Sequence, residues 1–562
     1  MAQNLAIFGG KKTIENPAPH YTWPQIDKQT EEAVIKQLHS SISIYDRSGA
    51  IEELEEKLRK VYGVKHALLF NSGTMALYTM YLGTGIKEGD EVICPAYTFY
   101  ATATPLFFLG AIPVLADCKE DGNINVKEIE KKITKKTKAI VVTHMWGVPC
   151  QMDEITSLAK KHDLVLLEDG SHAHFAEYNN KKVGTFGDAS AFSLQGQKTL
   201  SGGEGGFILT DNDEIFYKAL LLGHYNKRCK KEIPQDYPLS EFSITGMGLK
   251  LRIHPLACAI VLDQLNKIQN ILEGRNYFYN KIATELSKLP GLEIIPLPQY
   301  SKPTWYALVI KYKPEELGGL SREKFYESLK AEGCIELDIP NSTAPLNLYP
   351  LFQEPEKLFP GYKGNVKYKR GDFPQAEKFY NCALKLPVWH RAEDEEIANK
   401  YILAFKKVIN FYKSAMVDND LINKITAKAK KDGIQKFVVG AVILNKEGKF
   451  LLLNRPADDF MGGINELPSG KLEEGEGLLD ALKREVKEET NLDVEKVIKY
   501  IDSFDYISGS GKKVRQFNFL INVKDGEIKL TEHDGFVWSI QGDEAFEKLS
   551  KETKEIIVKI NS

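Results

Sequence analysis

Short apolar stretches alternate with amphipathic ones over the first 210 residues, and this alternation constrains the fold more than any other feature. The pattern predicts strands at about 66–70, 92–94, 112–116, 139–143, 164–168, 189–194 and 206–209. It predicts helices between them, at about 74–82, 101–109, 126–132 and 152–161. Strands that alternate with helices indicate an α/β fold with a mostly parallel sheet and helices on both faces.

The length of 562 residues predicts about three or four compact units. After a large domain at about 30–260, longer helices such as Gln264 to Leu286 and a strand from Thr304 to Tyr312 indicate a small α+β subdomain at about 261–414. This subdomain closes with a helix from Glu393 to Tyr412. A polar, lysine-rich helical stretch at 415–432 is predicted to be a linker, and a further unit spans 433–562.

Composition excludes several classes of protein. With 43% hydrophobic and 27% charged residues the chain is globular, and a net charge of −3 disfavours a nucleic-acid binder or a polybasic membrane anchor. The cysteines never form a CxxC pair, which suggests a reducing cytoplasm. The uncharged stretch from Val92 to Ala116 contains three prolines, so we expect it to be buried and not to span a membrane. The N-terminus lacks the pattern of a signal peptide, and we expect a cytoplasmic protein with neither membrane nor nucleic acid as partner.

A single lysine, Lys198, lies in the segment DASAFSLQGQKTLSGGEGG, between a predicted strand and a glycine-rich run. Its amine can form a Schiff base with pyridoxal phosphate (PLP) if an acid elsewhere pairs with the pyridine nitrogen. Asp169 and His172 follow a buried strand, at the edge of the sheet where α/β proteins bind ligands. Each piece alone is more often a solvated loop lysine or a helix N-cap, and the order of the pieces favours a site.

Two further segments extend this order. After the strand at 66–70, Gly73 and Thr74 open a helix whose free N–H groups can bind a phosphate. The segment Pro95-Ala-Tyr-Thr-Phe-Tyr100 then offers an aromatic ring to lie on a flat cofactor. Together these motifs resemble the DegT/StrS-type sugar aminotransferases, a PLP-dependent family of the aspartate aminotransferase fold. The resemblance covers residues 1–414.

The resemblance implies that Lys198 binds PLP covalently and shuttles the proton, and that Asp169 partners the pyridine nitrogen. Other cofactor contacts that it implies are stacking by Phe99, a hydrogen bond near the phenolic oxygen from His172, and phosphate binding by Gly73, Thr74 and Ser193. Many relatives use an asparagine to reach the phosphate of the neighbouring subunit in a homodimer. Lys250 stands at that position here, and a lysine can serve as a point charge for phosphate.

The family implies a keto-sugar substrate, such as a nucleotide-linked keto-hexose, and glutamate or glutamine as amino donor. A cyclitol ketone of the inosose type is the alternative substrate. Two other functions remain open on this fold: a PLP-binding regulator or scaffold without catalysis, and a PLP-dependent sugar dehydratase. The dehydratase is disfavoured because those enzymes carry a histidine in place of the lysine, and Lys198 is present.

A second chemistry begins after the predicted linker. Residues 470–492 read GKLEEGEGLLDALKREVKEETNL, in which Glu485, Glu488 and Glu489 project from one face of one helix. Three crowded carboxylates repel one another, and Mg²⁺ or Mn²⁺ would relieve that repulsion. The segment matches the Nudix box except at Asn491, where the box has glycine. Asparagine is the next best residue in a left-handed turn.

Strand patterns on both sides of the box, such as Phe437 to Leu444 and Lys449 to Arg455, complete a resemblance to Nudix hydrolases with their α/β/α fold. The resemblance implies that Glu485, Glu488 and Glu489 hold the metal, with Glu485 and Glu488 in the catalytic centre, and that Arg484 orients a glutamate. It further implies hydrolysis of a nucleoside diphosphate derivative. The alternative is a module of the same fold that senses a nucleotide and regulates the first unit.

Overall fold

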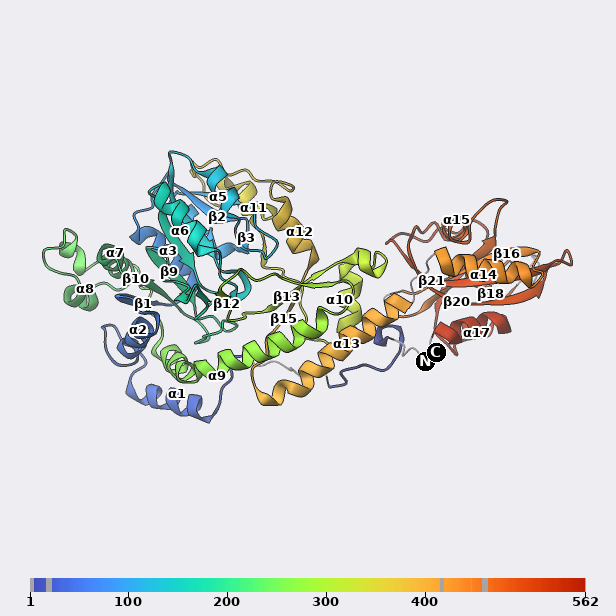
Figure 1. Ribbon diagram of the computed structural model, residues 1–562, viewed down its shortest axis with the longest axis horizontal. Coiled ribbons are helices and arrows are strands. Elements are labelled where there is room, and N and C mark those ends of the chain that lie inside the picture. Colours follow the sequence, from blue (N-terminus) through green and yellow to red (C-terminus); the bar gives the residue numbers. More distant parts are fainter. Residues whose placement is uncertain (1–4, 17–22, 415–418, 446, 457–462, 561–562) are drawn as a thin grey trace.

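The computed structural model describes residues 5–16, 23–414, 419–445, 447–456 and 463–560. The first half of the chain forms a seven-stranded sheet covered by helices on both sides (Figure 1). In spatial order its strands are β1 (His66–Phe70), β10 (Gly206–Thr210), β9 (Ala189–Ser193), β6 (Val165–Asp169), β5 (Thr137–Thr143), β2 (Glu91–Pro95) and β4 (Ile112–Ala116).

The sheet is mostly parallel, as predicted. Its pairs from β9 to β4 are parallel, and only β10 runs antiparallel to both of its neighbours, β1 and β9. Along β1, Leu68 and Phe70 pack on one face with α3 (Gly73–Gly83) and α7 (Asp213–Gly223). Ala67 and Leu69 pack on the other face with α2 (Gly49–Tyr62). This alternation is the period of two expected for a strand that is buried on both faces.

Further helices complete the two layers. Helix α9 (Pro255–Leu286) joins α2 over β1, β10 and β9, while α5 (Val126–Lys132) and α6 (Met152–Lys161) cover the strands β5 and β6. The predicted helix at 101–109 was wrong as one element. It is divided into a 3₁₀ turn, η2 (Tyr100–Thr102), and a short helix, α4 (Pro105–Phe108), that begins at its proline because proline fits the first turn of a helix and not its interior.

The small subdomain is built on a three-stranded sheet, β11 (Leu292–Ile294), β13 (Leu308–Tyr312) and β15 (Ala383–Leu386), with α10 (Arg322–Ala331) and α13 (Glu395–Ser414) packed on it. Helix α9 begins nine residues earlier than predicted, at Pro255, and runs from the large domain into this subdomain. Its first half packs on α2, and its last turns pack beside β11.

Of the segment 415–432, predicted as a linker, residues 415–418 lie outside the described residues, and residues 419–431 form a helix that packs in the C-terminal unit. Helix α14 (Asn419–Lys431) places Ala429 in the C-terminal core and packs Ile422 and Ile425 against it. These residues fall at i, i+3 and i+7, one face of a helix. The prediction was wrong because a stripe of only three apolar residues lies among many lysines.

The C-terminal unit contains two sheets. One consists of β19 (Ser469–Lys471), β16 (Lys436–Ile443), β21 (Lys513–Val523) and β20 (Val494–Ile507), and the other of β18 (Asn465–Glu466), β17 (Phe450–Asn454) and β22 (Gly535–Ser539). Besides α14, this unit contains the helices α15 (Leu478–Thr490), α16 (Glu544–Glu547) and α17 (Lys551–Ile560). Figure 1 shows this unit at one end of the molecule, beyond α13.

The first described segment of the chain lies between the small subdomain and the C-terminal unit. Its 3₁₀ turn η1 (Ala6–Phe8) is held to the small subdomain, where the Ala6 N–H donates to Glu332 Oε1 at 2.7 Å and the Phe8 ring lies 5.5 Å from that of Phe411. In a separate contact, Lys496 Nζ of β20, in the C-terminal unit, donates to the carbonyl oxygen of Leu317, in the small subdomain, at 2.7 Å. The C-terminal unit is therefore in direct contact with the small subdomain.

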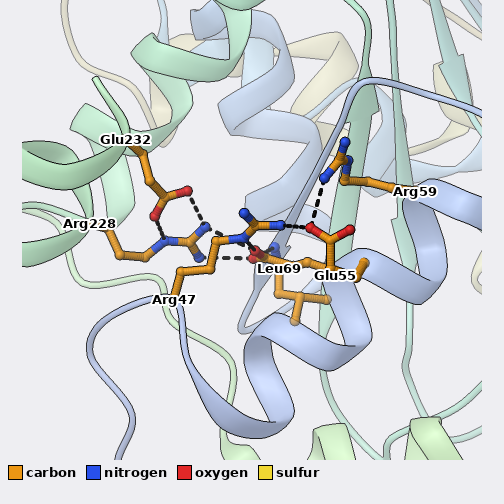
Figure 2. Close-up of polar contacts among 7 residues, drawn as sticks. Arg47, Glu55, Arg59, Leu69, Arg228 and Glu232 are labelled. Atoms are coloured by element: carbon orange, nitrogen blue, oxygen red, sulfur yellow. Dashed lines mark hydrogen bonds and ion pairs between the residues drawn. The ribbon is translucent and has the colours of Figure 1, made fainter. Parts of the chain in front are cut away.

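A buried network of charges ties the outer elements of the large domain together (Figure 2). Arg228, in α8 (Lys227–Glu232), donates to both carboxylate oxygens of Glu55 in α2, at 2.9 and 3.0 Å, and to those of Glu232 at 2.7 and 3.0 Å. Arg47 also contacts Glu55, and the Leu69 N–H of β1 donates to it. Glu55 is fully buried, and burial raises the pKa of its carboxyl group.

None of the helices in the described part of the chain has the length and apolar character needed to cross a membrane. Six of the seven cysteines are buried and Cys382 is half-buried, each with a free thiol.

Candidate active sites

Asp169 is the last residue of β6, at the carboxyl edge of the central sheet. The Thr102 hydroxyl donates to its Oδ2 at 2.7 Å and the Ser171 N–H donates to its Oδ1 at 3.1 Å. The hydroxyls of Thr98 and Thr143 lie 3.0 and 3.2 Å from that of Thr102. Since Asp169 is buried and held by two donors, its carboxylate is fixed in one orientation at the strand end where ligands bind.

Lys198 lies in the loop between β9 and β10. Its Nζ is 4.7 Å from the centroid of the Tyr306 ring, and its carbonyl oxygen accepts a hydrogen bond of 2.6 Å from Trp23 Nε1. Burial lowers the pKa of its amine to about 8, against the attraction of Asp169, which raises it. An amine with this pKa is available in its neutral form near physiological pH, as a nucleophile or proton carrier must be.

The ring of His172 is stacked with two aromatic rings, and one of these lies beside the Lys198 amine. Its ring lies 4.1 Å from that of Tyr306, with planes 6° apart, and 5.6 Å from that of Trp146. Burial, together with the nearby charge of Lys198, holds the pKa of His172 well below its ordinary value, so that the imidazole is neutral. Its Nδ1 is buried without a hydrogen-bond partner among the described residues and is therefore available to hydrogen-bond a ligand.

Gly73, Thr74 and Ser193 come together where helix α3 begins. The helix starts at Gly73, and its first N–H groups have no partner within the helix. A Cβ added to Gly73 would lie 2.6 Å from Ser193 Cβ, and one added to Gly206 would lie 2.7 Å from the Gly73 nitrogen. Only glycine at both positions lets the helix start approach the ends of β9 and β10 this closely.

The two remaining predicted cofactor residues are Phe99 and Lys250. Phe99 ends the short strand β3 (Tyr97–Phe99), three residues before Thr102, and its ring lies 4.2 Å from that of Tyr100. Lys250 is exposed, and its backbone pairs with that of His224. Within one chain no contact joins Lys250 to the Gly73 cradle in the described structure, so its role stays a prediction.

The residues present fit PLP. The Gly73 cradle offers N–H groups to a phosphate, Asp169 offers a fixed carboxylate, and Lys198 offers an amine of lowered pKa. The buried Nδ1 of His172 is a polar atom that lacks a partner. These features suit, in turn, the phosphate, the pyridine nitrogen, the aldehyde and the phenolic oxygen of the cofactor.

Three residues of this site were not predicted. Thr102 lies in the PAYTFYAT segment, and its hydroxyl could have been proposed from that motif. Trp23 and Tyr306 contact Lys198 from 175 and 108 residues away, and nothing in their local sequence indicates it.

A second site lies on α15 of the C-terminal unit. Arg484 donates to Glu485 Oε1 at 2.8 Å, to Glu488 Oε2 at 3.0 Å and to both oxygens of Glu476 at 2.8 and 2.9 Å. The Glu485 carboxylate lies against Gly470, where an added Cβ would be 1.9 Å from its Cδ. A side chain at position 470 would therefore displace the Glu485 carboxylate from where it lies.

Glu489 points away from Arg484 and is buried. Its Oε2 accepts a hydrogen bond of 2.8 Å from the Ser469 N–H, and burial raises its pKa to about 8. His533 and Glu466, 3.0 Å apart, lie near it. The helix ends at Asn491, which has φ of 60°, so the prediction of a left-handed residue at this departure from the Nudix box is confirmed.

Among the described residues, no three His, Cys, Asp or Glu side chains form a group that could hold a metal ion. Glu485 and Glu488 face Arg484, whereas Glu489 faces Ser469. The donor type suits a hard divalent ion, because all three offer carboxylate oxygens on one helix. Their arrangement does not suit such an ion, because Arg484 lies between Glu485 and Glu488.

Comparison with known proteins identifies a family for each of the two units. The family model described as the DegT/DnrJ/EryC1/StrS aminotransferase family matches residues 24–401, and that of the NUDIX domain matches residues 435–556. PseC of Helicobacter pylori, an aminotransferase involved in the biosynthesis of pseudoaminic acid, has a similar structure. Its TM-score is 0.58 at 29% identity, over 69% of this chain and 98% of that chain.

Two relatives show the range of substrates within the family. A putative L-glutamine:3-amino-2,3-dideoxy-scyllo-inosose aminotransferase of Micromonospora echinospora is 30% identical over 406 residues, 70% of this chain and 91% of that protein. A UDP-4-amino-4,6-dideoxy-N-acetyl-beta-L-altrosamine transaminase of Campylobacter jejuni is 33% identical over 370 residues, 65% of this chain and 91% of that protein. With lysine, acid and glycine cradle in place, the chain belongs to the DegT/DnrJ/EryC1/StrS family of PLP-dependent aminotransferases and also carries a Nudix hydrolase domain.

Proposed function

We propose that the first unit transfers an amino group from glutamate or glutamine to the keto carbon of a sugar, with a nucleotide-linked keto-hexose as the first candidate. The observation that carries this proposal is the amine of Lys198, which has a pKa of about 8 and a fixed position beside Tyr306 and His172. Similarity to the Campylobacter transaminase of a UDP-linked amino sugar supports the substrate class.

Each residue of the site has a distinct task in this reaction. When bound, PLP withdraws electrons from the carbon that loses its proton. Asp169 keeps the pyridine nitrogen protonated, and Thr102 holds the Asp169 carboxylate in place. Lys198 Nζ takes the proton from the donor's α-carbon and returns it at a neighbouring atom, because the lysine stays beside both. The neutral imidazole of His172 would offer its unpaired Nδ1 to the phenolic oxygen of the bound cofactor.

We infer a homodimer in which Lys250 reaches the phosphate site of the neighbouring subunit. In one chain Lys250 is exposed, and so are apolar side chains just before it, Phe242, Ile244 and Met247. A second copy would cover these side chains and bring the Lys250 ammonium to an anion. Light scattering at falling protein concentration, with PLP content measured in parallel, tests this: a monomer that keeps its PLP in full contradicts it.

A panel experiment tests the aminotransferase. We expect the purified protein, incubated with PLP, glutamate or glutamine and a set of nucleotide-linked keto-sugars and inososes, to give one aminated product detectable by mass. Lys198→Ala should abolish the product and the cofactor fixed by borohydride. Lys182→Ala, at a half-buried lysine of β8 (Lys181–Lys182), is the control that should change neither. Amination of an inosose alone would favour the cyclitol alternative. Similarity to the Micromonospora relative supports this alternative.

For the second unit we propose hydrolysis of a nucleoside diphosphate derivative with Mg²⁺ or Mn²⁺. This rests on the glutamates of α15 and on Arg484, whose guanidinium holds Glu476, Glu485 and Glu488 together. Metal binding would require the Glu485 and Glu488 carboxylates to turn away from Arg484. The alternative, a nucleotide sensor, predicts tight binding without turnover.

Phosphate release from nucleotide sugars and oxidised nucleoside triphosphates, measured with Mg²⁺, Mn²⁺ or chelator, separates these two functions. Glu488→Gln should lower the rate by orders of magnitude while the fold survives, because the change at an exposed helix position is small. Glu474→Gln, an exposed carboxylate before the helix, is the matched control. Binding without phosphate release under every condition would favour the sensor.

A further inference from the structure

Lys385 forms an ion pair at the border of the Lys198 site. It lies in β15, and its Nζ is 3.0 Å from Asp338 Oδ2. The backbones of the two residues are fixed together, since the Asp338 N–H donates to the Lys385 carbonyl at 2.9 Å and the Lys385 N–H donates to that of Asp338 at 2.8 Å. The side chains of Lys385 and Asp338 therefore project side by side from the small subdomain.

This pair faces a cavity that is shared with the active site. The cavity, about 400 Å³, is lined by Lys385 and Asp338 on one side and by Trp23, Gln197 and Tyr306 on the other. Tyr306 is the ring beside Lys198 Nζ, and Trp23 holds the Lys198 carbonyl. A molecule in this cavity would contact both the ion pair and the Tyr306 ring that lies beside the reactive amine.

The other charged groups of the cavity are held by neighbours within the small subdomain. Lys330 Nζ donates to the carbonyl oxygen of Ile335 at 2.5 Å, and the Glu336 carboxylate accepts from the Tyr401 hydroxyl. Lys385 differs, because its partner is the Asp338 side chain, which is 43% exposed and free to turn toward water. Its ammonium can exchange one carboxylate for another at little cost.

We propose that Lys385 binds a carboxylate of the amino donor, and that Asp338 is its partner while the donor is absent. This inference rests on the proposed transamination. Glutamate and glutamine both carry a carboxylate next to the amine that must reach Lys198, and a cation beside the reactive amine would fix that geometry. The charge of Lys385 acts on Lys198 and on His172, lowering the pKa of both, which agrees with its nearness to the site.

Steady-state kinetics test the proposal. Lys385→Met should raise the KM for the donor about 10- to 100-fold, the loss of a charged hydrogen bond, while the KM for the keto substrate stays unchanged. Lys311→Met is the matched control, since Lys311 lies in the adjacent strand β13 and pairs with Glu293. Asp338→Asn frees the Lys385 ammonium and should leave the donor KM unchanged or lower it. If the pair were only structural, both variants would impair the protein alike.

A second readout needs no turnover. In PLP-free protein, glutarate, which has the carboxylates of the donor and no amine, should protect Lys198 from an amine-directed reagent. Protection should require at least tenfold more glutarate in Lys385→Met, and the pH profile of Lys198 modification should move upward because a neighbouring positive charge is gone.

These measurements separate the two proposals. Failure of the parent protein to transaminate with any amino acid would refute the proposed function, while glutarate protection would still test Lys385. Transamination by Lys385→Met with an unchanged donor KM and unchanged protection would overturn the inference and leave the proposed function standing.

Discussion

Asp169 and Thr102 form the best-defined polar contact of the PLP site. Asp169→Asn removes the negative charge that keeps a pyridine nitrogen protonated, so we expect PLP to remain bound and turnover to fall by orders of magnitude. Thr102→Val removes one of two hydrogen bonds to the carboxylate and should slow turnover about tenfold. Rate and PLP content of both variants check this, and an Asp169→Asn enzyme with the parent rate would exclude its role.

Lys198 should show its lowered pKa directly. In PLP-free protein, its modification by an amine-directed reagent should be half-maximal near pH 8, whereas an ordinary lysine requires about pH 10.5. The sign follows from burial, which disfavours the ammonium: above pH 8 the amine is neutral and reactive, and below pH 8 it is protonated and inert. Mass spectrometry of the peptides that contain Lys198 and Lys182 measures the pH midpoint of modification of each lysine. Equal midpoints would contradict the burial of the amine.

Part of the candidate site could be predicted from the sequence because its residues lie in local motifs. Asp169 stands at a strand end, Gly73 at a helix start and Lys198 in the glycine-rich loop between two strands, all of which short-range patterns indicate. Trp23 and Tyr306 could not be predicted, since only folding brings them beside Lys198. The departure of Glu489 from the other two glutamates also depends on tertiary contact, with the Ser469 N–H.

At the scale of elements, strands were easier to predict than the ends and breaks of helices. The strands of the central sheet are buried on both faces and appear in the sequence as apolar runs. Helix α9 extends upstream to Pro255 because proline and the His254 cap start it there, a local cue without apolar periodicity. The break within 101–109 is likewise set by backbone geometry.

The network of Arg228 and Glu55 links α8 to α2 and should be important for stability. Arg228→Met leaves Glu55 buried with one fewer positive partner, so we expect a loss of about 3–5 kcal/mol in the free energy of unfolding. Glu214→Gln breaks an exposed ion pair with Lys218 and should cost less than about 1 kcal/mol. Urea denaturation measures both. A double variant, Arg228→Met with Glu55→Met, should be more stable than Arg228→Met alone, because the fully buried carboxylate at position 55 is gone.

Helix α14 should be needed by the Nudix unit although it lies before residues 435–556, which match the family model. A fragment of residues 419–562 should be more stable than one of residues 433–562 by at least about 2 kcal/mol, because removing α14 uncovers the apolar surface under Ile422, Ile425 and Ala429. Thermal and urea unfolding of the two fragments compare them. Equal stability would mean that α14 serves only as a connector.

At the scale of the whole molecule, two chemical sites lie in separate units that touch through the small subdomain. We expect Glu488→Gln to abolish phosphate release without changing transamination, and Lys198→Ala to do the reverse, because no described residue belongs to both sites. Both activities measured in the same preparations test this independence. A change of more than a few-fold in the activity of the unaltered unit would indicate coupling across the contact of Lys496 with Leu317.

The turn η1 packs early residues of the chain against late ones, and this has a consequence during synthesis on the ribosome. Ala6 bonds to Glu332, 326 residues later, and Phe8 packs on Phe411. At about 5–20 residues per second, this segment waits tens of seconds for its partners to emerge. Its apolar side chains stay uncovered for that time, so this short segment is where a chaperone that meets nascent chains would find an early target.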